Sequence, residues 1–506
     1  MADSQRKSML AGSQASGTTN TLTRDLSNQE PPAKRSKIGV ERRFLLLDSR
    51  IVSTTTNMDL TIGSPEKHSA NPLFVEDQPW ERRLDNFYGN IIFDVDEEVY
   101  KCWYSPFIVA NSSKGMSLQE RLDEPYKGHK DQEMGICYAV SKDGINWEKP
   151  KLGLVDYHGS KRNNIIWRGP HGAGVLQDQN DPDIDRKYKC IFQGLNVSFS
   201  PDGLDWSSPH KIECDLPGDT HNNATWVSSL DKYVAFTRSW TKTDTEIIGL
   251  ESKTNHNWVR QVARIESSNF VDWSPAKVVI EGASWALQPY ALSVFEYAGL
   301  YLGLLAIHDQ VSDRVWTELA WSIDTTTWER IDQGKPLIGC GETELEYDYG
   351  CVYACVTPVF LSDQIQIYYG GSDWLHFGWR TGCLALATLR PDGFAGYQQN
   401  KRNEPGTIST SLISYQGGAL KVTADVEVGG SIEIKVLDTK NTVLAESELN
   451  QTATDKIVLE AWQIKSDEIR LVFTVLSAKL FSIVLDGSGS KKNSVSHTTD
   501  TGGSEG

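Results

Sequence analysis

The sequence has no long hydrophobic run and no excess of positive charge, and each absence excludes a class of protein. No stretch approaches the roughly 18 consecutive apolar residues of a membrane-spanning helix. The polar residues 1–5 lack the apolar core of a secretory signal. The formal net charge is −17, from 50 Lys and Arg against 67 Asp and Glu, whereas nucleic-acid binders need a basic surface that displaces counterions from phosphates. We therefore expect a cytoplasmic protein with neither a membrane nor a nucleic-acid partner.

Cysteines are few and scattered. Only Cys351 and Cys355 among the eight are close in sequence, and no second pair stands at the spacing of a zinc site. We expect reduced and mostly buried thiols, no bound metal and no cofactor.

Helical periodicity is missing from every long stretch, and both ends of the chain lack hydrophobic patterning. Residues 1–42 are rich in Ser, Thr, Gln, Asn and Lys, and residues 487–506 in Gly, Ser, Thr and Lys. Such compositions cannot bury enough surface to offset the entropy of ordering, so we predict two disordered tails. The basic cluster 34–37 resembles a short nuclear-import signal, which leaves a nuclear interaction scaffold as one alternative.

Tryptophan, in contrast, is abundant, and part of it follows a repeat. Of the 16 Trp residues, 15 lie before residue 380. The segment 141–147, Ser-Lys-Asp-Gly-Ile-Asn-Trp, recurs at 200–206, 267–273 and 322–328 with Ser, Asp or Asn, and Trp at its first, third and seventh positions, and a degenerate copy spans 390–394. The Asp and Gly favour a tight turn whose carboxylate accepts hydrogen bonds from backbone amides. The Trp residues of the repeat are therefore predicted to pack over hairpins.

The spacing of the repeat predicts the fold. Its third-position residues are 59, 67, 55 and 68 positions apart, and each unit contains β-prone runs for about four antiparallel strands. Repeated four-stranded sheets around a central channel are typical of a β-propeller. We predict an all-β protein with a five-bladed β-propeller in 85–398, preceded by an extended segment, 43–84, that packs on it.

A different pattern follows the polar linker at 401–406. Apolar and polar residues alternate at 420–424, 432–436 and 469–475, as they do in half-buried antiparallel strands. We predict a C-terminal β-sandwich in 408–486. Two roles stay open for it, a structural brace and a carbohydrate-binding module, and the brace is favoured.

This organisation and several short phrases resemble a known family. The phrases are Asn71-Pro72-Leu73, Pro79-Trp80-Glu81, Tyr88-Gly89-Asn90, 141–157, Asn163-Asn164-Ile165, 186–189, Asp348-Tyr349-Gly350, 368–371, Ile469-Arg470-Leu471 and Leu480-Phe481-Ser482. Between residues 43 and 486 the chain is similar to the invertase, levanase and arabinanase superfamily of propeller glycosidases, and more specifically to a largely bacterial group of family-32-like glycosyl hydrolases. The resemblance implies a carbohydrate substrate, with furanosides among the candidates, and hydrolysis of a glycosidic bond.

The chain departs from that superfamily at the nucleophile motif. No Asn-Asp-Pro-Asn-Gly stands at the start of the first predicted blade. Asn180-Asp181-Pro182-Asp183 is similar in letters, but Asn, Asp and Pro at that position are ordinary turn residues. A non-catalytic propeller that binds a glycan or a protein through its channel therefore remains the alternative to hydrolysis.

Acidic residues stand before the predicted first strands of four blades, and these strands line the channel of a propeller. Glycoside cleavage needs one carboxyl group that protonates the departing oxygen and one that attacks the anomeric carbon or activates water. We assign Asp85 as base or nucleophile, from its first-blade position in the resemblance. Asp219 orients the sugar or stabilises the transition state, and Asp348 or Glu346 donates the proton. Substrate-binding candidates are Tyr88, Asp178 and His221 for sugar hydroxyls and Trp103, Trp226 and Trp374 for stacking on a ring. The sugar, its linkage and the stereochemical outcome stay open.

Overall fold

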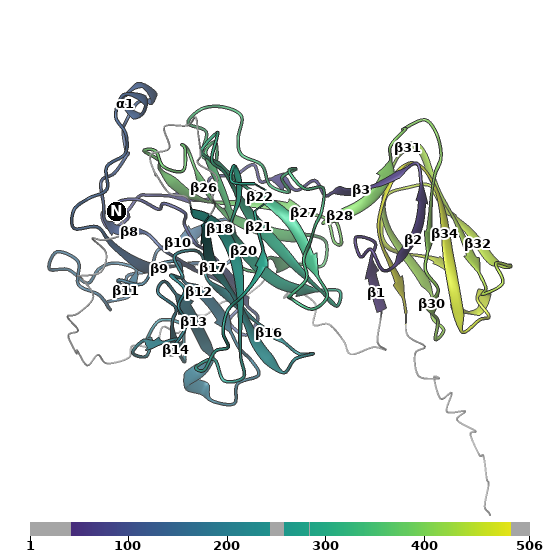
Figure 1. The fold of residues 1–506 in the computed structure, drawn as a ribbon, viewed down its shortest axis with the longest axis horizontal. Helices are drawn as coiled ribbons and strands as arrows, with labels where there is room; N and C mark the ends of the chain where they lie inside the picture. The colour runs from purple at the N-terminus through teal and green to yellow at the C-terminus, as the bar shows by residue number, and fades with distance from the viewer. Residues whose placement is uncertain (1–41, 243–257, 283, 487–506) are drawn as a thin grey trace, which may run out of the picture.

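The structure is a computed structural model that describes residues 42–242, 258–282 and 284–486. The predicted C-terminal tail and the basic cluster at 34–37 lie outside these ranges, as does the first tail up to residue 41. The fold is nearly all-β, and its helices within the described ranges are α1 (Leu118–Asp123) and two 3-10 helices, η2 (Ile184–Arg186) and η3 (Ala461–Gln463). None of the helices in these ranges is long and apolar enough to cross a membrane. Figure 1 shows two bodies of strands, a larger one with the labelled strands β8 to β27 and a smaller one around β31 and β34.

The larger body begins with three antiparallel sheets that follow one another along the chain. Their strand orders are β10-β9-β7-β6, with β8 and β11 also paired to β9, then β12-β13-β14-β15, and then β16-β17-β18-β19. The bounds are β6 Asn90–Asp94, β7 Val99–Tyr104, β8 Phe107–Val109, β9 Glu133–Ser141, β10 Trp147–Glu148, β11 Ile165–Arg168, β12 Gly174–Gln177, β13 Tyr188–Phe192, β14 Asn196–Ser200, β15 His210–Lys211, β16 Asn223–Val227, β17 Lys232–Lys242, β18 Trp258–Ser267 and β19 Lys277–Ile280.

Two further groups of strands complete the larger body. One has the order β20-β21-β22-β23 and the other β24-β26-β27, with β25 on β26 and with β4 and β5 on the outer edge of β27. A single parallel pair between β22 and β24 joins the two groups. The bounds are β4 Glu66–Lys67, β5 Phe74–Val75, β20 Leu287–Tyr297, β21 Leu300–Asp309, β22 Arg314–Ser322, β23 Glu329–Arg330, β24 Cys351–Ala354, β25 Val359–Phe360, β26 Ile365–Ser372 and β27 Gly382–Leu389.

Hydrogen bonds join the first strands of the five groups into a ring. The Asn90 side chain donates to the carbonyl of Ala173 (2.7 Å) and accepts from the backbone N–H of Val175 (2.9 Å), which links β6 to β12. Asn223 makes the corresponding pair of bonds from β16 to β20. Further bonds link the segments of β12 and β16, of β20 and β24, and of β24 and β6. The loops that lead into β6, β12 and β16 therefore lie side by side.

The four turns of the sequence repeat share one set of hydrogen bonds. In the first, Asp143 Oδ1 accepts from the backbone N–H groups of Ile145 (2.9 Å) and Asn146 (2.7 Å). The corresponding pair of backbone bonds is accepted by Asp202, Asn269 and Asp324. The four Trp rings pack against hydrophobic clusters of the sheets. The repeat therefore marks hairpin turns with a packed ring, as the sequence predicts.

The smaller body is a bent ten-stranded sheet. Its two longest strands, β31 (Leu420–Leu437) and β34 (Glu468–Leu485), have 18 residues each and pair with each other. The predicted alternation is present, since every second side chain is fully buried, for example Ile469, Leu471 and Phe473. Truncating one of them, Phe473→Ala, is expected to cost about 3–5 kcal/mol. The other strands are β1 Arg42–Leu45, β2 Val52–Thr56, β3 Met58–Ile62, β28 Ala395–Gln399, β29 Gly406–Thr410, β30 Ile413–Ser414, β32 Val443–Leu449 and β33 Ala453–Leu459.

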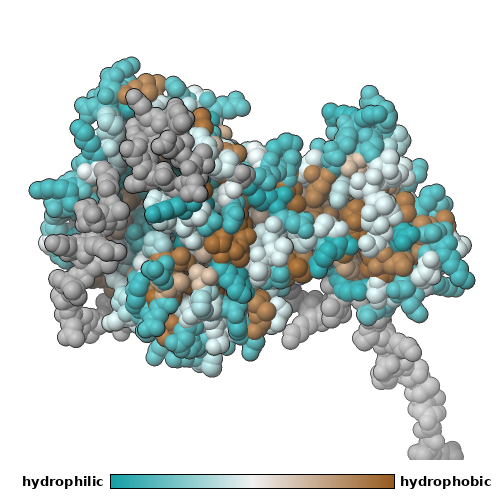
Figure 2. Space-filling view, viewed as in Figure 1, coloured by the Kyte–Doolittle hydropathy of each residue, from teal (hydrophilic) through white to brown (hydrophobic). Residues whose placement is uncertain are grey.

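The segment 43–84 contributes strands to both bodies. β1, β2 and β3 pair with β34, β29 and β28 in the smaller body, whereas β4 and β5 pair with β27 in the larger one. Asp392, in the degenerate fifth copy of the repeat, is fully buried and accepts from the hydroxyls of Tyr297 and Ser482 and from Arg43. The segment and this carboxylate therefore tie the two bodies together. On the face shown in Figure 2, hydrophilic residues surround the exposed hydrophobic ones, which lie in small groups.

Candidate functional site

The loops before β6, β12 and β16 meet at one end of the ring, and we call this end the mouth. It comprises residues 85–88, His171, residues 219–221 and the side chains that contact them. The ring centroid of Tyr88 lies 5.0 Å from that of His171 and 5.3 Å from that of His221. Three sheets therefore contribute to one cluster, and four of the predicted site residues, Asp85, Tyr88, Asp219 and His221, belong to it.

Asp85 is held by two arginines at one of its two carboxylate oxygens. Arg83 Nε (2.9 Å) and Arg380 Nη2 (2.7 Å) both bond to Oδ1, and Oδ2 has no hydrogen bond among the described residues. Burial opposes ionisation of Asp85, but the charges of Arg380 and Arg83 outweigh it and lower the pKa to about 2. Asp85 is thus a fixed anion with one oxygen left for a ligand.

Asn86 orients two tyrosine hydroxyls at the mouth. Arg380 Nη2 donates to Asn86 Oδ1 (2.8 Å), which fixes the amide so that its Nδ2 donates to the hydroxyls of Tyr88 (2.6 Å) and Tyr290 (2.7 Å). Burial raises the pKa of Tyr88 well above its usual value, so this phenol keeps its proton. Since both hydroxyls accept from Asn86 and lie 3.5 Å apart, at least one phenolic proton is free to bond to a ligand.

Asp219 is the more open carboxylate of the mouth, with 34% of its side chain exposed. Its Oδ2 lies 3.5 Å from Arg238 Nη1, and its Oδ1 is buried without a hydrogen-bond partner. Arg238 is positioned by its own bonds to the Asp219 carbonyl (3.0 Å), Thr220 Oγ1 (3.1 Å) and the Tyr290 carbonyl (2.9 Å). Asp85 and Asp219 therefore each keep an unbonded oxygen, and they precede strands of different sheets.

The two mouth histidines are neutral at ordinary pH. Burial lowers the pKa of His171 to about 4 and that of His221 to about 3. His171 Nδ1 and His221 Nε2 are buried without a hydrogen-bond partner. Below the mouth, Tyr88, His221 and Tyr353 line a small cavity together with Ala291 and Ala306. This cavity, of about 10 Å³, is too small to hold a sugar.

Asp348 and Glu346, the predicted proton donors, do not join the mouth. The Asp348 side chain is fully buried, its Oδ2 accepts from the Tyr369 hydroxyl (2.8 Å), and it pairs with Lys67 of β4 (2.7 Å). Glu346 is exposed on the loop before β24. Among the described residues neither carboxylate has a contact with Asp85 or Asp219, because the loop directs Asp348 toward the outer strands.

Trp103 and Trp374, two predicted sugar platforms, are buried. Trp103 is fully buried in the first sheet, and its Nε1 donates to the carbonyl of Gly203 (2.7 Å). Trp374 is 4% exposed and stacks on Tyr349, with 5.6 Å between ring centroids. Both rings pack within the protein and offer no open face for a sugar.

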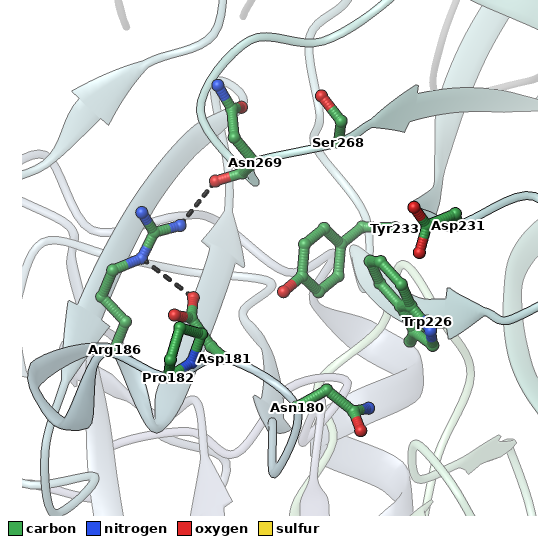
Figure 3. Close-up of a pocket in the computed structure, with 9 residues that line it drawn as sticks. All are labelled: Asn180, Asp181, Pro182, Arg186, Trp226, Asp231, Tyr233, Ser268 and Asn269. Carbon is green, nitrogen blue, oxygen red and sulfur yellow. Dashed lines mark hydrogen bonds and ion pairs between the residues drawn. The ribbon is translucent and has the colours of Figure 1, made fainter.

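Asp178 and Trp226 lie at the other end of the strands, which we call the far end. β12 ends at Gln177, so Asp178 follows the strand, whereas the sequence-based prediction placed it before the strand. Its Oδ2 accepts from the Tyr233 hydroxyl (2.5 Å) and from Lys189 Nζ (2.9 Å), and its Oδ1 accepts from Asn180 N (2.8 Å). Trp226 lies beside Tyr233 in a pocket of about 590 Å³, shown in Figure 3.

The phrase 180–183 lines part of this pocket as a turn. Asp181 Oδ1 accepts from the Asp183 backbone N–H (3.0 Å), and Asp183 caps η2. Figure 3 shows Arg186 in an ion pair with Asp181 and hydrogen-bonded to the backbone carbonyl of Asn269. The segment therefore resembles the nucleophile motif in sequence only and forms a turn, as predicted from its residues.

The mouth arginines and His171 are not among the site residues predicted from the sequence. Arg238 and Arg260 lie within β17 and β18, and Arg380 lies in the loop between β26 and β27. None of these arginines belongs to a motif, and the prediction of the site was based on acidic residues that precede strands. The contact between His171 and Tyr88 arises from the bonds between β6 and β12, which the sequence does not reveal.

Metal binding has no support among the described residues, where no group of three or more His, Cys, Asp or Glu side chains is placed to hold an ion. All eight cysteines are free thiols, and six of them are buried.

No known protein family matches the sequence, and no curated protein matches it. Among solved structures, the similar ones are mainly glycoside hydrolases and phosphorylases. A β-1,2-mannobiose phosphorylase from Listeria innocua is 13% identical over 64% of this chain and 96% of its own, with a TM-score of 0.43. A fructofuranosidase from Schwanniomyces occidentalis is 10% identical over 82% of this chain and 98% of its own (TM-score 0.38). An N-acetylgalactosamine deacetylase from F. plautii is 12% identical over 66% and 96% (TM-score 0.40).

Proposed function

We propose that the larger body is a five-bladed β-propeller and that the smaller body is a β-sandwich. The ring of hydrogen bonds among β6, β12, β16, β20 and β24 supports the first assignment, because a propeller surrounds its channel with the first strand of each blade. The burial of alternate residues along β31 and β34 supports the second.

We infer that the mouth binds a carbohydrate and hydrolyses a glycosidic bond. The observation that carries this proposal is the pair of unbonded carboxylate oxygens, Asp85 Oδ2 and Asp219 Oδ1, on two sheets of one cluster. Asp85, kept ionised by its arginines, acts as the nucleophile or as the base that activates water. Asp219 has the longer arginine contact and more exposure, so it replaces Asp348 as the candidate proton donor. Tyr88 and Tyr290 bind sugar hydroxyls.

Substitution of the two carboxylates tests the proposal. Chromogenic fructo- and arabinofuranosides and a set of pyranosides serve as substrates, since the sequence resemblance points first to furanosides. Asp85→Asn and Asp219→Asn are expected to lower kcat by about 10²–10⁴ with the fold intact by circular dichroism. Asp231→Asn, an exposed acid at the far end, is the matched control and keeps wild-type kcat. Wild-type turnover in both mouth variants contradicts the proposal.

Non-catalytic carbohydrate binding is the second candidate, and the two arginines on Asp85 favour it. A carboxylate held this firmly is suited to accepting hydrogen bonds from hydroxyls without changing its protonation. Calorimetric binding of a sugar by the wild-type protein, lost in Asp85→Asn and without turnover of any bound glycoside, would establish this candidate instead of hydrolysis.

A further inference from the structure

The hairpin of β17 and β18 presents two arginines and a tryptophan on one face toward the mouth. Trp240 is paired with Arg260 across the two strands, and Arg238 is two residues before Trp240. Side chains at these positions share a face of the sheet. The guanidinium carbons of Arg238 and Arg260 lie 4.3 and 5.3 Å from the ring centroid of Tyr290, and 5.4 and 5.0 Å from that of Trp240. Arg260 therefore belongs to the mouth, next to Arg238.

Arg260 differs from the other mouth arginines in having no acidic partner. Arg83 and Arg380 bind Asp85, and Arg238 binds Asp219. Arg260 is only 9% exposed, and among the described residues no carboxylate pairs with it. Its Nη1 donates to the side-chain oxygen of Gln288 (3.0 Å), which is a neutral acceptor. Among the described residues Arg260 thus has no carboxylate in direct contact, and the charge of Asp219 acts on it only from beyond ion-pair distance.

The unused atoms of Arg260 form the edge that recognises oxyanions. Nε is buried and has no hydrogen-bond partner, and Nη2 has none among the described residues. These two N–H groups point in parallel and match the two oxygens of a carboxylate or a phosphate. Burial lowers the pKa of Arg260 to about 10, with a further contribution from Arg238, so the group is still charged at neutral pH. A buried, unpaired charge is costly, and an anionic ligand would remove that cost.

We propose that Arg260 binds an oxyanion at the mouth, so that the carbohydrate handled there is acidic or is accompanied by a free oxyanion such as phosphate. This inference rests on the proposed carbohydrate function of the mouth and assigns its ligand class. Arg260 Nε and Nη2 donate to the oxyanion, Trp240 and Tyr290 flank the two guanidinium groups, and Asp219 keeps its contact with Arg238. The sugar ring then extends toward Asp85 and the tyrosine hydroxyls.

Two substitutions on one strand test the role of Arg260. Arg260→Met removes the unpaired charge, whereas Arg264→Met, the matched control on β18, removes an arginine that is 5% exposed and bonded to Thr325 Oγ1 (2.9 Å) and Glu266 (3.0 Å). Without ligand, Arg260→Met is expected to have a Tm equal to or above that of the wild type, and Arg264→Met a lower one. A fall in Tm with Arg260→Met, of the size seen with Arg264→Met, would show that Arg260 is a structural residue and contradict the proposal.

Binding is measured by calorimetry at constant ionic strength, with glucuronate, galacturonate and inorganic phosphate as anionic probes and glucose and galactose as neutral ones. The wild type is expected to bind at least one anionic probe more than tenfold tighter than the neutral sugars, and Arg260→Met to lose that preference. Tight binding of a uronate places the anion on the sugar, and tight binding of phosphate alone identifies a free oxyanion. Equal affinities of the wild type and Arg260→Met for every probe overturn the inference.

The outcome is separable from that of the proposed hydrolysis. If Arg260→Met hydrolyses neutral glycosides as fast as the wild type and no anion binds, the inference fails and the hydrolase proposal stands. If anions bind through Arg260 but no glycoside is turned over, the inference stands and only the catalytic proposal fails.

Discussion

The mouth and the far end lie at opposite ends of the same strands, and they differ in how completely their charged side chains are hydrogen-bonded. At the far end, both oxygens of Asp178 are bonded, to Lys189, to Tyr233 and to the backbone of Asn180. At the mouth, Asp85 and Asp219 each keep an oxygen without a partner, and Arg260 keeps an unpaired edge. Both ends hold acids that are at least partly buried, so the presence of acids does not distinguish them. What distinguishes them is that Asp85 and Asp219 at the mouth each keep an unbonded oxygen, whereas Asp178 at the far end keeps none.

The largest expected effect concerns the far end. Lys189 is fully buried and pairs with Asp178 and Asp181, each at 2.9 Å. Lys189→Met leaves a buried carboxylate without its cation and is expected to destabilise the protein by about 3–5 kcal/mol. Urea unfolding measures the loss, and Lys335→Met, at an exposed pair, should change stability by less than about 1 kcal/mol. Ligand affinity at the mouth should be unchanged in folded Lys189→Met. A changed affinity would show that the two ends are not independent.

A smaller effect is expected from Arg380→Met at the mouth, because Arg83 still holds Asp85. With a pKa near 2 against a usual value of about 3.9, ionised Asp85 stabilises the fold by about 2–3 kcal/mol. This contribution is complete above pH 4 and is lost as the pH falls through 2. We expect Arg380→Met to cost about 1–2 kcal/mol at pH 7 and less at pH 2.5.

Urea unfolding at pH 7, 4 and 2.5 checks this dependence. The double variant Asp85→Asn/Arg380→Met isolates the pair, since the cost of Arg380→Met should shrink when Asp85 is already neutral. An equal cost in both backgrounds would mean that Arg380 stabilises the mouth through its other contacts, to Asn86 and Tyr353.

The effect that is smallest at neutral pH is the acid sensitivity that the mouth histidines confer. The pKa of His221 is about 3 in the fold and about 6.5 in an unfolded chain. Between these values the unfolded state binds the proton, so stability falls by up to about 1.4 kcal/mol for each unit that the pH falls below 6.5. His221→Asn should flatten this dependence, and the exposed His210→Asn at β15 should not. Equal slopes in the two variants would show that His221 does not govern the acid response.

The sequence predicts the turns and the half-buried strands because their physics is local. Asp143 makes its bonds two and three residues along the chain, and the alternation in β34 requires one buried face. Asp85, Tyr88 and His221 could be selected because they stand just before first strands. Asp178 could not be placed, since the end of β12 decides whether it lies at the mouth or at the far end.

Arg260 and Asp348 show why the rest of the site is not predictable from local patterns. Arg260 lies in the middle of a strand and reaches the mouth only through the pairing of β17 with β18. Asp348 stands before a first strand, as Asp85 does, but its carboxylate pairs with Lys67, nearly 300 positions earlier in the chain, and does not join the mouth. Contacts between distant segments decide both cases.

The pairing of β1 with β34 has a consequence for biosynthesis. Arg42 is opposite Leu485, so a ribosome must add more than 400 residues after β1 before its partner exists. At about 5–20 residues per second this takes on the order of half a minute or more. For most of that time β2 and β3 also lack their partners, β29 and β28. An apolar strand exposed for so long would promote aggregation. β2 has the sequence Val-Ser-Thr-Thr-Thr. Its polar side chains keep this strand soluble in the nascent chain until its partner strand has been synthesised.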